Sequence, residues 1–299
     1  MRRILFIVLF TAFAAVLNAA NLKPYILAYE TSKQISEIRT SLKTNLKTEG
    51  FNILGEYKPA NDANRWLIVV GSSDLTSAVQ KIGGLTGFAA SLRIGITRES
   101  GVWKITYTNP KYWGNAYFRD DYPKVENYYN NISKKLVLAM KKSGSYIGTA
   151  FGSKNGLELD DLREYQYMMA MPEFDDVVEL EDFGSFNEAV AKIDANLKKG
   201  ISGLKKVYEI KIPGKNLKLY GIALNGSDGE ASFMPIIDRG TPKHTAFLPY
   251  EILVNDDEVI MLHGRFRIAL SFPDLTMGTF SKIMSTPGDI EDAFEKLCE

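Results

Sequence analysis

Three side chains that can donate hydrogen bonds lie at alternate positions in the run MLHGRFRIAL, residues 261–270. If this run is a β-strand, His263, Arg265 and Arg267 share one face, because side chains alternate along a strand. Arginine offers a planar fork of N–H groups that matches a carboxylate or a phosphate. The pattern therefore predicts an anion-binding face.

A structural role for this face is the alternative. It could be a solvated strand face whose charges pair across the sheet with Glu251, Asp256 or Glu258. The comparable strand of the first half carries Lys104, Thr106 and Thr108 instead. Any anion site would therefore belong to the second half of the chain.

The other histidine lies in a polar, turn-rich segment. His244 closes the run DRGTPKH, which begins at Asp238 and leads toward a strand that contains Tyr250. Loops beside a sheet commonly carry binding groups, so we expect His244 and Tyr250 to complete the ligand site, with His244 at its mouth. His244, His263 and Asp238 could alternatively form a metal or acid–base cluster, although their spacing proves no contact. We otherwise expect no metal and no cofactor.

The elements that must position these residues begin with a strand over 25–30, an amphipathic helix within 31–50 and a strand over 51–57. Ser32 is the expected N-cap of the helix, and Gly50 its stop. The second half repeats this order.

The repeat consists of a strand over 176–182, a helix within 184–200 and a strand over 204–212. Ser185 and Glu188 have capping-box spacing at the start of the helix. The later elements also correspond. In the first half we predict strands over 65–71, 90–97 and 102–108 and a helix over 124–142; in the second, strands over 217–224, 247–254 and 259–272 and a helix from 289.

The sequence thus predicts an α+β fold made of two copies of a strand-helix-several strands-helix unit. The expected division is a leader over 1–20, a first domain over 21–143, a connector over 144–175 and a second domain over 176–299. The leader has Arg2 and Arg3, an apolar run over 4–17 and small residues before position 21, which is typical of a secretory signal peptide. We therefore expect a periplasmic or secreted protein with no integral membrane segment after cleavage.

Composition excludes some classes of protein. The chain has 299 residues with 36 Lys and Arg against 36 Asp and Glu, so we expect no nucleic-acid partner. One cysteine, Cys298, excludes a disulfide scaffold. Standard signatures of hydrolases, metalloproteases and nucleotide-binding enzymes are absent, so we expect a binding protein rather than an enzyme.

Two long segments of the first half, YETSKQISEIRTSLKTNLKTEGFNILGEY and VVGSSDLTSAVQKIGGLTGFAASLRIGITRESGVWKITYTNP, resemble the domain-of-unknown-function 302 family. The segment TAFLPYEILVNDDEVIMLHGRFRIALSFPD is similar to the same family section, although the stretch over 225–243 looks inserted. The resemblance implies a tandem pair of small antiparallel sheets, each gripped by two helices and often paired edge to edge into dimers. It implies an uncharacterised exported bacterial protein with no assigned activity.

These observations favour a protein that binds a small anionic or apolar ligand in its second domain. One alternative is a structural module that binds a protein partner or forms a homodimer and encloses no ligand. The other is a metal-dependent or hydrolytic enzyme that uses His244, His263 and Asp238.

Overall fold

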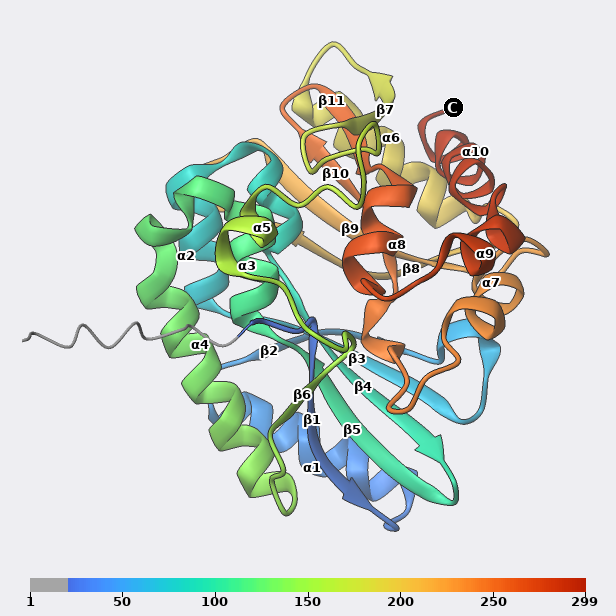
Figure 1. Ribbon diagram of the computed structural model, residues 1–299. Coiled ribbons are helices and arrows are strands. Elements are labelled where there is room, and N and C mark those ends of the chain that lie inside the picture. The colour runs from blue at the N-terminus through green and yellow to red at the C-terminus, as the bar shows by residue number, and fades with distance from the viewer. Residues whose placement is uncertain (1–20) are drawn as a thin grey trace, which may run out of the picture.

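The computed structural model describes residues 21–299, and the predicted leader over 1–20 lies outside the described residues. The chain forms two antiparallel sheets with helices packed around them (Figure 1). This arrangement confirms the predicted α+β class. Between residues 21 and 299, no helix combines the length and the apolar character needed to cross a bilayer.

The first sheet has the strand order β2-β3-β4-β5-β1-β6. Its strands are β1 (Tyr25–Thr31), β2 (Asn52–Tyr57), β3 (Arg65–Gly71), β4 (Leu92–Glu99), β5 (Val102–Thr108) and β6 (Thr149–Phe151). The accompanying helices are α1 (Ile35–Thr48), α2 (Ser73–Ile82), α3 (Pro110–Phe118), α4 (Tyr122–Ser143) and the short α5 (Leu159–Arg163).

The second sheet has the order β7-β11-β10-β9-β8. Its strands are β7 (Val177–Asp182), β8 (Leu204–Lys211), β9 (Leu217–Leu224), β10 (Tyr250–Asn255) and β11 (Glu258–Leu262). The helices are α6 (Phe186–Lys199), α7 (Glu230–Ile237), α8 (Gly264–Ser271), α9 (Met277–Phe280) and α10 (Thr286–Cys298). In the opposite direction this order is β8-β9-β10-β11-β7, which matches the order β2-β3-β4-β5-β1 of the first sheet.

Helices α1 and α6, the first helix of each half, begin with different caps. The Ser185 side chain accepts a hydrogen bond from the Glu188 N–H, as the capping spacing predicts. Ser32 is not the N-cap of α1, because the helix begins at Ile35 after Gln34, whose side chain makes no capping bond. Gly50, with φ of +85°, follows α1 as expected.

The predicted strand over 259–272 is wrong beyond Leu262. β11 ends there, and α8 begins at Gly264 with His263 as its N-cap, whose ring nitrogen accepts from the Arg265 N–H. Residues 266–271 are all buried, so apolar residues occupy every side of the helix. The sequence therefore lacks the alternation of apolar and polar residues, with a period of 3.6, that identifies an amphipathic helix. The stretch over 225–243 is not an insertion, since α7 follows β9 as α2 follows β3.

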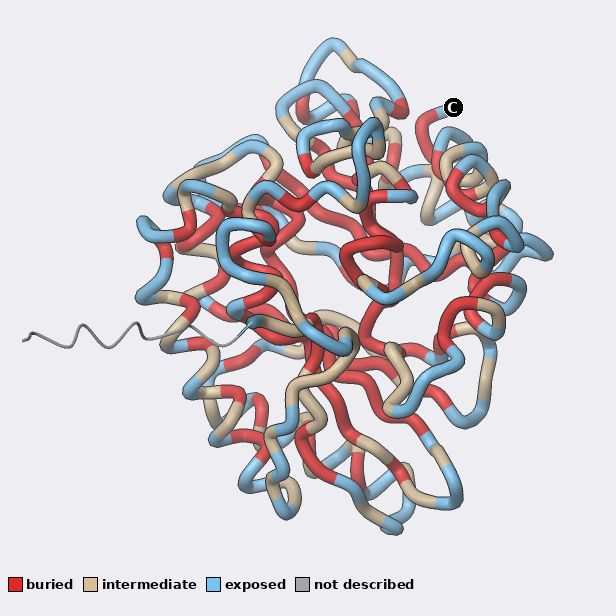
Figure 2. The backbone as a smooth tube through the Cα atoms, in the orientation of Figure 1, coloured by how far each residue is buried: buried red, intermediate tan, exposed pale blue. Residues whose placement is uncertain are grey.

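The two sheets approach each other at their β2 and β8 edges, where each strand has a bulge. The register shifts between Ile53 and Gly55 in β2 and between Lys206 and Tyr208 in β8. A Cβ atom on Gly55 would overlap the carbonyl oxygen of Val207. Buried segments accordingly run through the middle of the molecule (Figure 2).

This contact predicts that Gly55→Ala lowers the free energy of unfolding by about 1–3 kcal/mol, because the backbone of Val207 must move. Urea unfolding would measure the change. Gly288→Ala is the matched control, since Gly288 has nothing within 4 Å of its added Cβ. Equal stabilities for the two variants would show that the β2–β8 contact is not tight.

Candidate functional site

The predicted donor face is not formed. His263, Arg265 and Arg267 lie at the start of α8 rather than along a strand. Residues two apart on a helix point about 200° apart, so the two arginines project in nearly opposite directions. Arg265 is exposed, whereas Arg267 is only 2% exposed. The alternation that suggested a shared face therefore has no structural counterpart.

Arg267 instead holds a buried carboxylate. Its Nη1 donates to Glu251 Oε2 at 3.0 Å, and its Nη2 donates to the carbonyl oxygens of Phe247 at 2.8 Å and Pro249 at 2.6 Å. Pairing with Glu251 was the structural alternative for this face. The partner is the expected one, but both side chains are buried in the core instead of lying in solvent.

The same carboxylate joins the two sheets. Glu251 forms an ion pair with Arg93 of β4 and accepts a hydrogen bond from the Tyr208 hydroxyl. In the first sheet, Arg93 of β4 pairs with Val69 of β3, and Val69 pairs in turn with Gly55 of β2. In the second sheet, Glu251 lies opposite Gly221, which lies opposite Tyr208. Arg93 and Glu251 thus hold the same place in their sheets with opposite charge.

Tyr250 belongs to this cluster and not to an open site. The Arg267 guanidinium lies 4.9 Å from the centre of the Tyr250 ring. Burial raises the pKa of the Tyr250 hydroxyl, which has no hydrogen-bond partner among residues 21–299. The structure thus brings Tyr250 and Arg267 together and leaves Arg265 outside.

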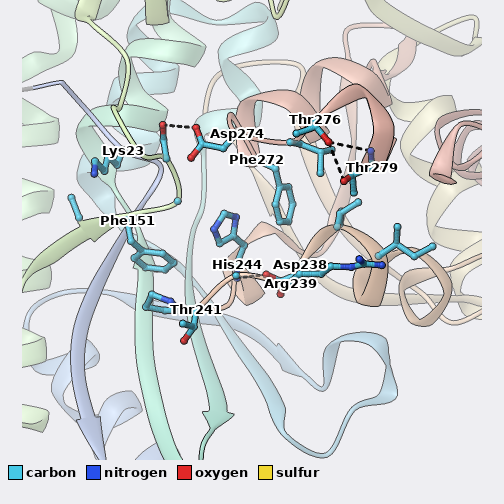
Figure 3. Close-up of a pocket in the computed structure, with 18 residues that line it drawn as sticks. Lys23, Phe151, Asp238, Arg239, Thr241, His244, Phe272, Asp274, Thr276 and Thr279 are labelled. Atoms are coloured by element: carbon cyan, nitrogen blue, oxygen red, sulfur yellow. Dashed lines mark hydrogen bonds between the residues drawn. The ribbon is translucent and has the colours of Figure 1, made fainter. Parts of the chain in front are cut away.

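His244 lines a pocket of about 460 Å³, shown in Figure 3. Four segments build its wall: Lys23 just before β1, the chain around β6, the end of α7 with the loop that follows it, and the chain from the end of α8 into α9. Its apolar lining includes Phe151, Ile236, Ile237, Pro242, Phe272 and Leu275.

Aromatic rings hold the His244 side chain. It stacks on Phe272 with ring centres 4.5 Å apart, and it packs against Tyr25 at 4.8 Å and Phe151 at 5.6 Å. Its Nδ1 lies 3.2 Å from the carbonyl oxygen of Ser271. A carbonyl only accepts, so Nδ1 must carry the hydrogen.

His244 is consequently a hydrogen-bond acceptor toward the pocket. Burial lowers the pKa of its imidazole, which is therefore neutral at pH 7 and leaves Nε2 with a free lone pair. Nε2 forms no hydrogen bond with any residue from 21 to 299. A neutral imidazole in this tautomer can accept a proton or a hydrogen bond from a bound molecule.

The charges that line the pocket favour an anion. Lys23 and Arg239 form no ion pair within the described chain, although the Lys23 ammonium donates to the carbonyl of Lys154. Of the two acidic residues, Asp238 pairs with buried Arg65, whereas Asp274 accepts from the Lys154 N–H at 2.6 Å and the Ser153 hydroxyl at 3.2 Å but has no cationic partner among residues 21–299. Two cations against one unpaired carboxylate leave the lining with one net positive charge.

The alternative metal or acid–base cluster does not assemble. The backbone N–H of His244 donates to Asp238 Oδ1 at 2.9 Å, but the His244 ring contacts Ser271 at the end of α8. His263 lies at the other end of that helix, about 12 Å away along the axis. Within 21–299, no three His, Cys, Asp or Glu side chains are grouped so as to hold a metal ion.

Sequence reasoning identified His244 and Asp238 but missed most of the pocket. Arg239 follows Asp238 directly, so the polar turn already contained a signal for it. Lys23 and Phe151 come from distant parts of the chain, and no local pattern places them beside His244. Their positions depend on the pairing of β6 with β1.

Glu230, at the start of α7, is a second buried carboxylate between the sheets. Its Oε1 accepts from the Tyr57 hydroxyl at 2.9 Å and the Leu224 N–H at 3.2 Å, and its Oε2 accepts from the Ala60 N–H at 2.8 Å. Burial without a cationic partner raises the pKa of Glu230 to about 7, although these donors oppose the rise.

The fold and site define an α+β protein with two similarly ordered antiparallel sheets and a pocket beside their junction. No protein-family model matches the chain, and no curated protein matches it. A solved structure described as the uncharacterized conserved protein DUF302 from Bacillus stearothermophilus is similar to part of it. The identity is 18% and the TM-score 0.36, over 40% of this chain and 98% of that one.

The buried cluster predicts that Arg267→Leu lowers the free energy of unfolding by about 3–5 kcal/mol, because Glu251 loses a charged partner in the core. Arg265→Leu, on the exposed side of the same helix, should change it by less than about 0.5 kcal/mol. Urea unfolding would compare them. A larger effect at Arg265 would contradict the assignment of Arg267 to the core.

Glu230 predicts a specific pH dependence. Because its pKa is about 7 in the folded protein and 4.5 ordinarily, the folded state binds the proton more tightly. This contribution stabilises the fold below pH 4.5 and is lost as pH rises through 7, by about 3 kcal/mol. Glu230→Gln should remove that component, which urea unfolding at pH 5 and pH 8 would detect. An unchanged difference between the two pH values would contradict it.

Proposed function

We propose that this chain is an exported protein, built from two copies of one α+β unit, that binds a small organic anion with an apolar body. The ligand would occupy the pocket around His244. The observation that carries this proposal is the unpartnered Nε2 of a neutral imidazole, held by aromatic rings in a pocket with two unpaired cations.

Each part of the pocket supports a different part of the ligand. Lys23 and Arg239 would attract its negative charge, and Arg239 could offer two N–H groups to a carboxylate or sulfonate. Phe151 and Phe272 would contact its apolar body. His244 would accept a hydrogen bond from a hydroxyl or amine on the same molecule.

The shared topology supports two copies of one unit. The order β2-β3-β4-β5-β1 corresponds to β8-β9-β10-β11-β7, and the bulges in β2 and β8 lie at the same place. The bulges in β1 and β7 also correspond, around Ala28 and Leu180. Matching irregularities are more specific than matching strand order, because a bulge is a local departure from regular pairing.

The export proposal depends on the leader alone. Its basic start, apolar run and small residues before position 21 are the features that signal peptidases recognise. The protein recovered from the exported fraction of its source cells should begin at Asn21. An intact mass that retains residues 1–20 would contradict cleavage.

The pocket is tested with 1-anilinonaphthalene-8-sulfonate, an aromatic anion, by isothermal titration. We expect one site on the native protein and about tenfold weaker binding in Arg239→Ala, which loses a charge-assisted contact. Arg98→Ala is the matched control, because Arg98 is also exposed and does not line the pocket. Equal affinities for the two variants would place the probe elsewhere.

A structural module that binds a protein partner is the second candidate. It is favoured by the polar contacts that join the first sheet to the second half of the chain, formed by Arg93 with Glu251, Arg65 with Asp238, and Tyr57 with Glu230. Native and denatured masses of protein purified from its source would separate the candidates. A mass difference that fits a small molecule supports the pocket, whereas equal masses favour the module.

A further inference from the structure

The outer edge of β7 has no strand beside it among residues 21–299. β7 pairs with β11 on one side and ends the order of the second sheet on the other. The backbone groups on the free edge can pair with an added strand. An unpaired edge alone does not identify a partner, so the equivalent edge and the local charges must be considered.

The first sheet shows how an edge of this shape is covered. β1 is the counterpart of β7, and the Ile147 and Gly148 N–H groups donate to the carbonyls of Ala28 at 2.6 Å and Leu27 at 3.0 Å. β6 then continues antiparallel along β1. An extended segment thus pairs along β1 and begins beside the bulge of β1 at Ala28. β7 has a bulge at the corresponding position, Leu180.

The side chains of β7 carry one sign of charge. Glu179, Glu181 and Asp182 are exposed and form no ion pair with any residue of the described chain. Across residues 172–182 there are six acidic side chains and no Lys or Arg, and two of the six, Glu173 and Asp175, pair with Arg119. Glu181 and Glu295 of α10 both act on Cys298, whose thiol pKa is raised to about 12 by burial and by these charges. Glu295 of α10 thus adds negative charge near β7, and Lys192 of α6 opposes it there.

A second copy of the same edge is a poor partner. Two β7 strands paired antiparallel would bring Glu179, Glu181 and Asp182 close to the same acidic residues of the other strand. Like charges at close cross-strand positions are destabilising. A strand with Lys or Arg at these positions would instead form favourable cross-strand pairs.

We propose that the outer edge of β7 docks an extended, basic polypeptide segment as an added antiparallel strand. Main-chain hydrogen bonds would provide the pairing, and Glu179, Glu181 and Asp182 would select for Lys and Arg. This proposal is independent of the His244 pocket, which is lined by other segments of the chain.

The test uses the mature full-length protein and a fluorescein-labelled ten-residue peptide of alternating lysine and valine. Fluorescence anisotropy should show binding that weakens with salt, and amide exchange in residues 177–182 should slow when the peptide binds. The same peptide with glutamate in place of lysine should not bind. Unchanged exchange in 177–182 would overturn the proposal even if anisotropy rises.

Charge reversal provides the matched comparison. Glu179→Lys/Glu181→Lys should weaken peptide binding at least tenfold. Glu126→Lys/Glu164→Lys, which reverses two exposed charges elsewhere, should bind like the parent protein. Equal loss in both variants would show a nonspecific effect of net charge and overturn the assignment. Slow exchange in 177–182 of a dimer without peptide would assign the edge to a second copy instead.

Discussion

The structure depends on a buried carboxylate that two arginines must neutralise, one from the first sheet and one from helix α8. Glu251 of β10 lies between Arg267 of α8 and Arg93 of β4, and all three are almost inaccessible to solvent. A buried charge that loses a partner is costly, so the sheets cannot slide or separate without a large penalty. Because Arg93 and Glu251 hold the same place in the two sheets, pairing a unit with a copy of itself would bury like charges. The opposite charges therefore favour pairing between the two different halves.

This constraint also fixes the wall of the pocket. Helix α7 is tied to the first sheet at both ends: Glu230 at its start bonds to Tyr57 and Ala60, and Asp238 just after its end pairs with Arg65. The loop that follows leads directly to His244 and Arg239 lies within it. The position of the imidazole relative to Phe151 and Lys23 thus depends on contacts made by neighbouring residues with the first sheet. Chemistry at the pocket and stability of the junction are coupled through one short segment.

The two sheets share topology but differ in the chemistry of matching positions. Asn109 and His263 are both N-caps at the start of a helix that follows the fifth strand of each unit, yet only α8 continues into a buried arginine. The edge of β1 is covered by the chain after α4, whereas no strand of residues 21–299 covers the outer edge of β7. Two sheets with the same strand order therefore present different surfaces, and sites cannot be transferred from one half to the other by position.

The sequence by itself determined the fold class and most elements, because local periodicity and caps such as Ser185 and Gly50 record short-range geometry. It also marked His244 and Asp238 as polar residues in a turn. It could not distinguish a fully buried helix from a strand over 264–271, since buried helices lack a polar face, and the shared face of His263, Arg265 and Arg267 was lost with that error. Only the tertiary structure decided that Arg267 neutralises Glu251 and that Lys23 and Phe151 lie beside His244. Those contacts join residues far apart in the chain, and no local pattern encodes them.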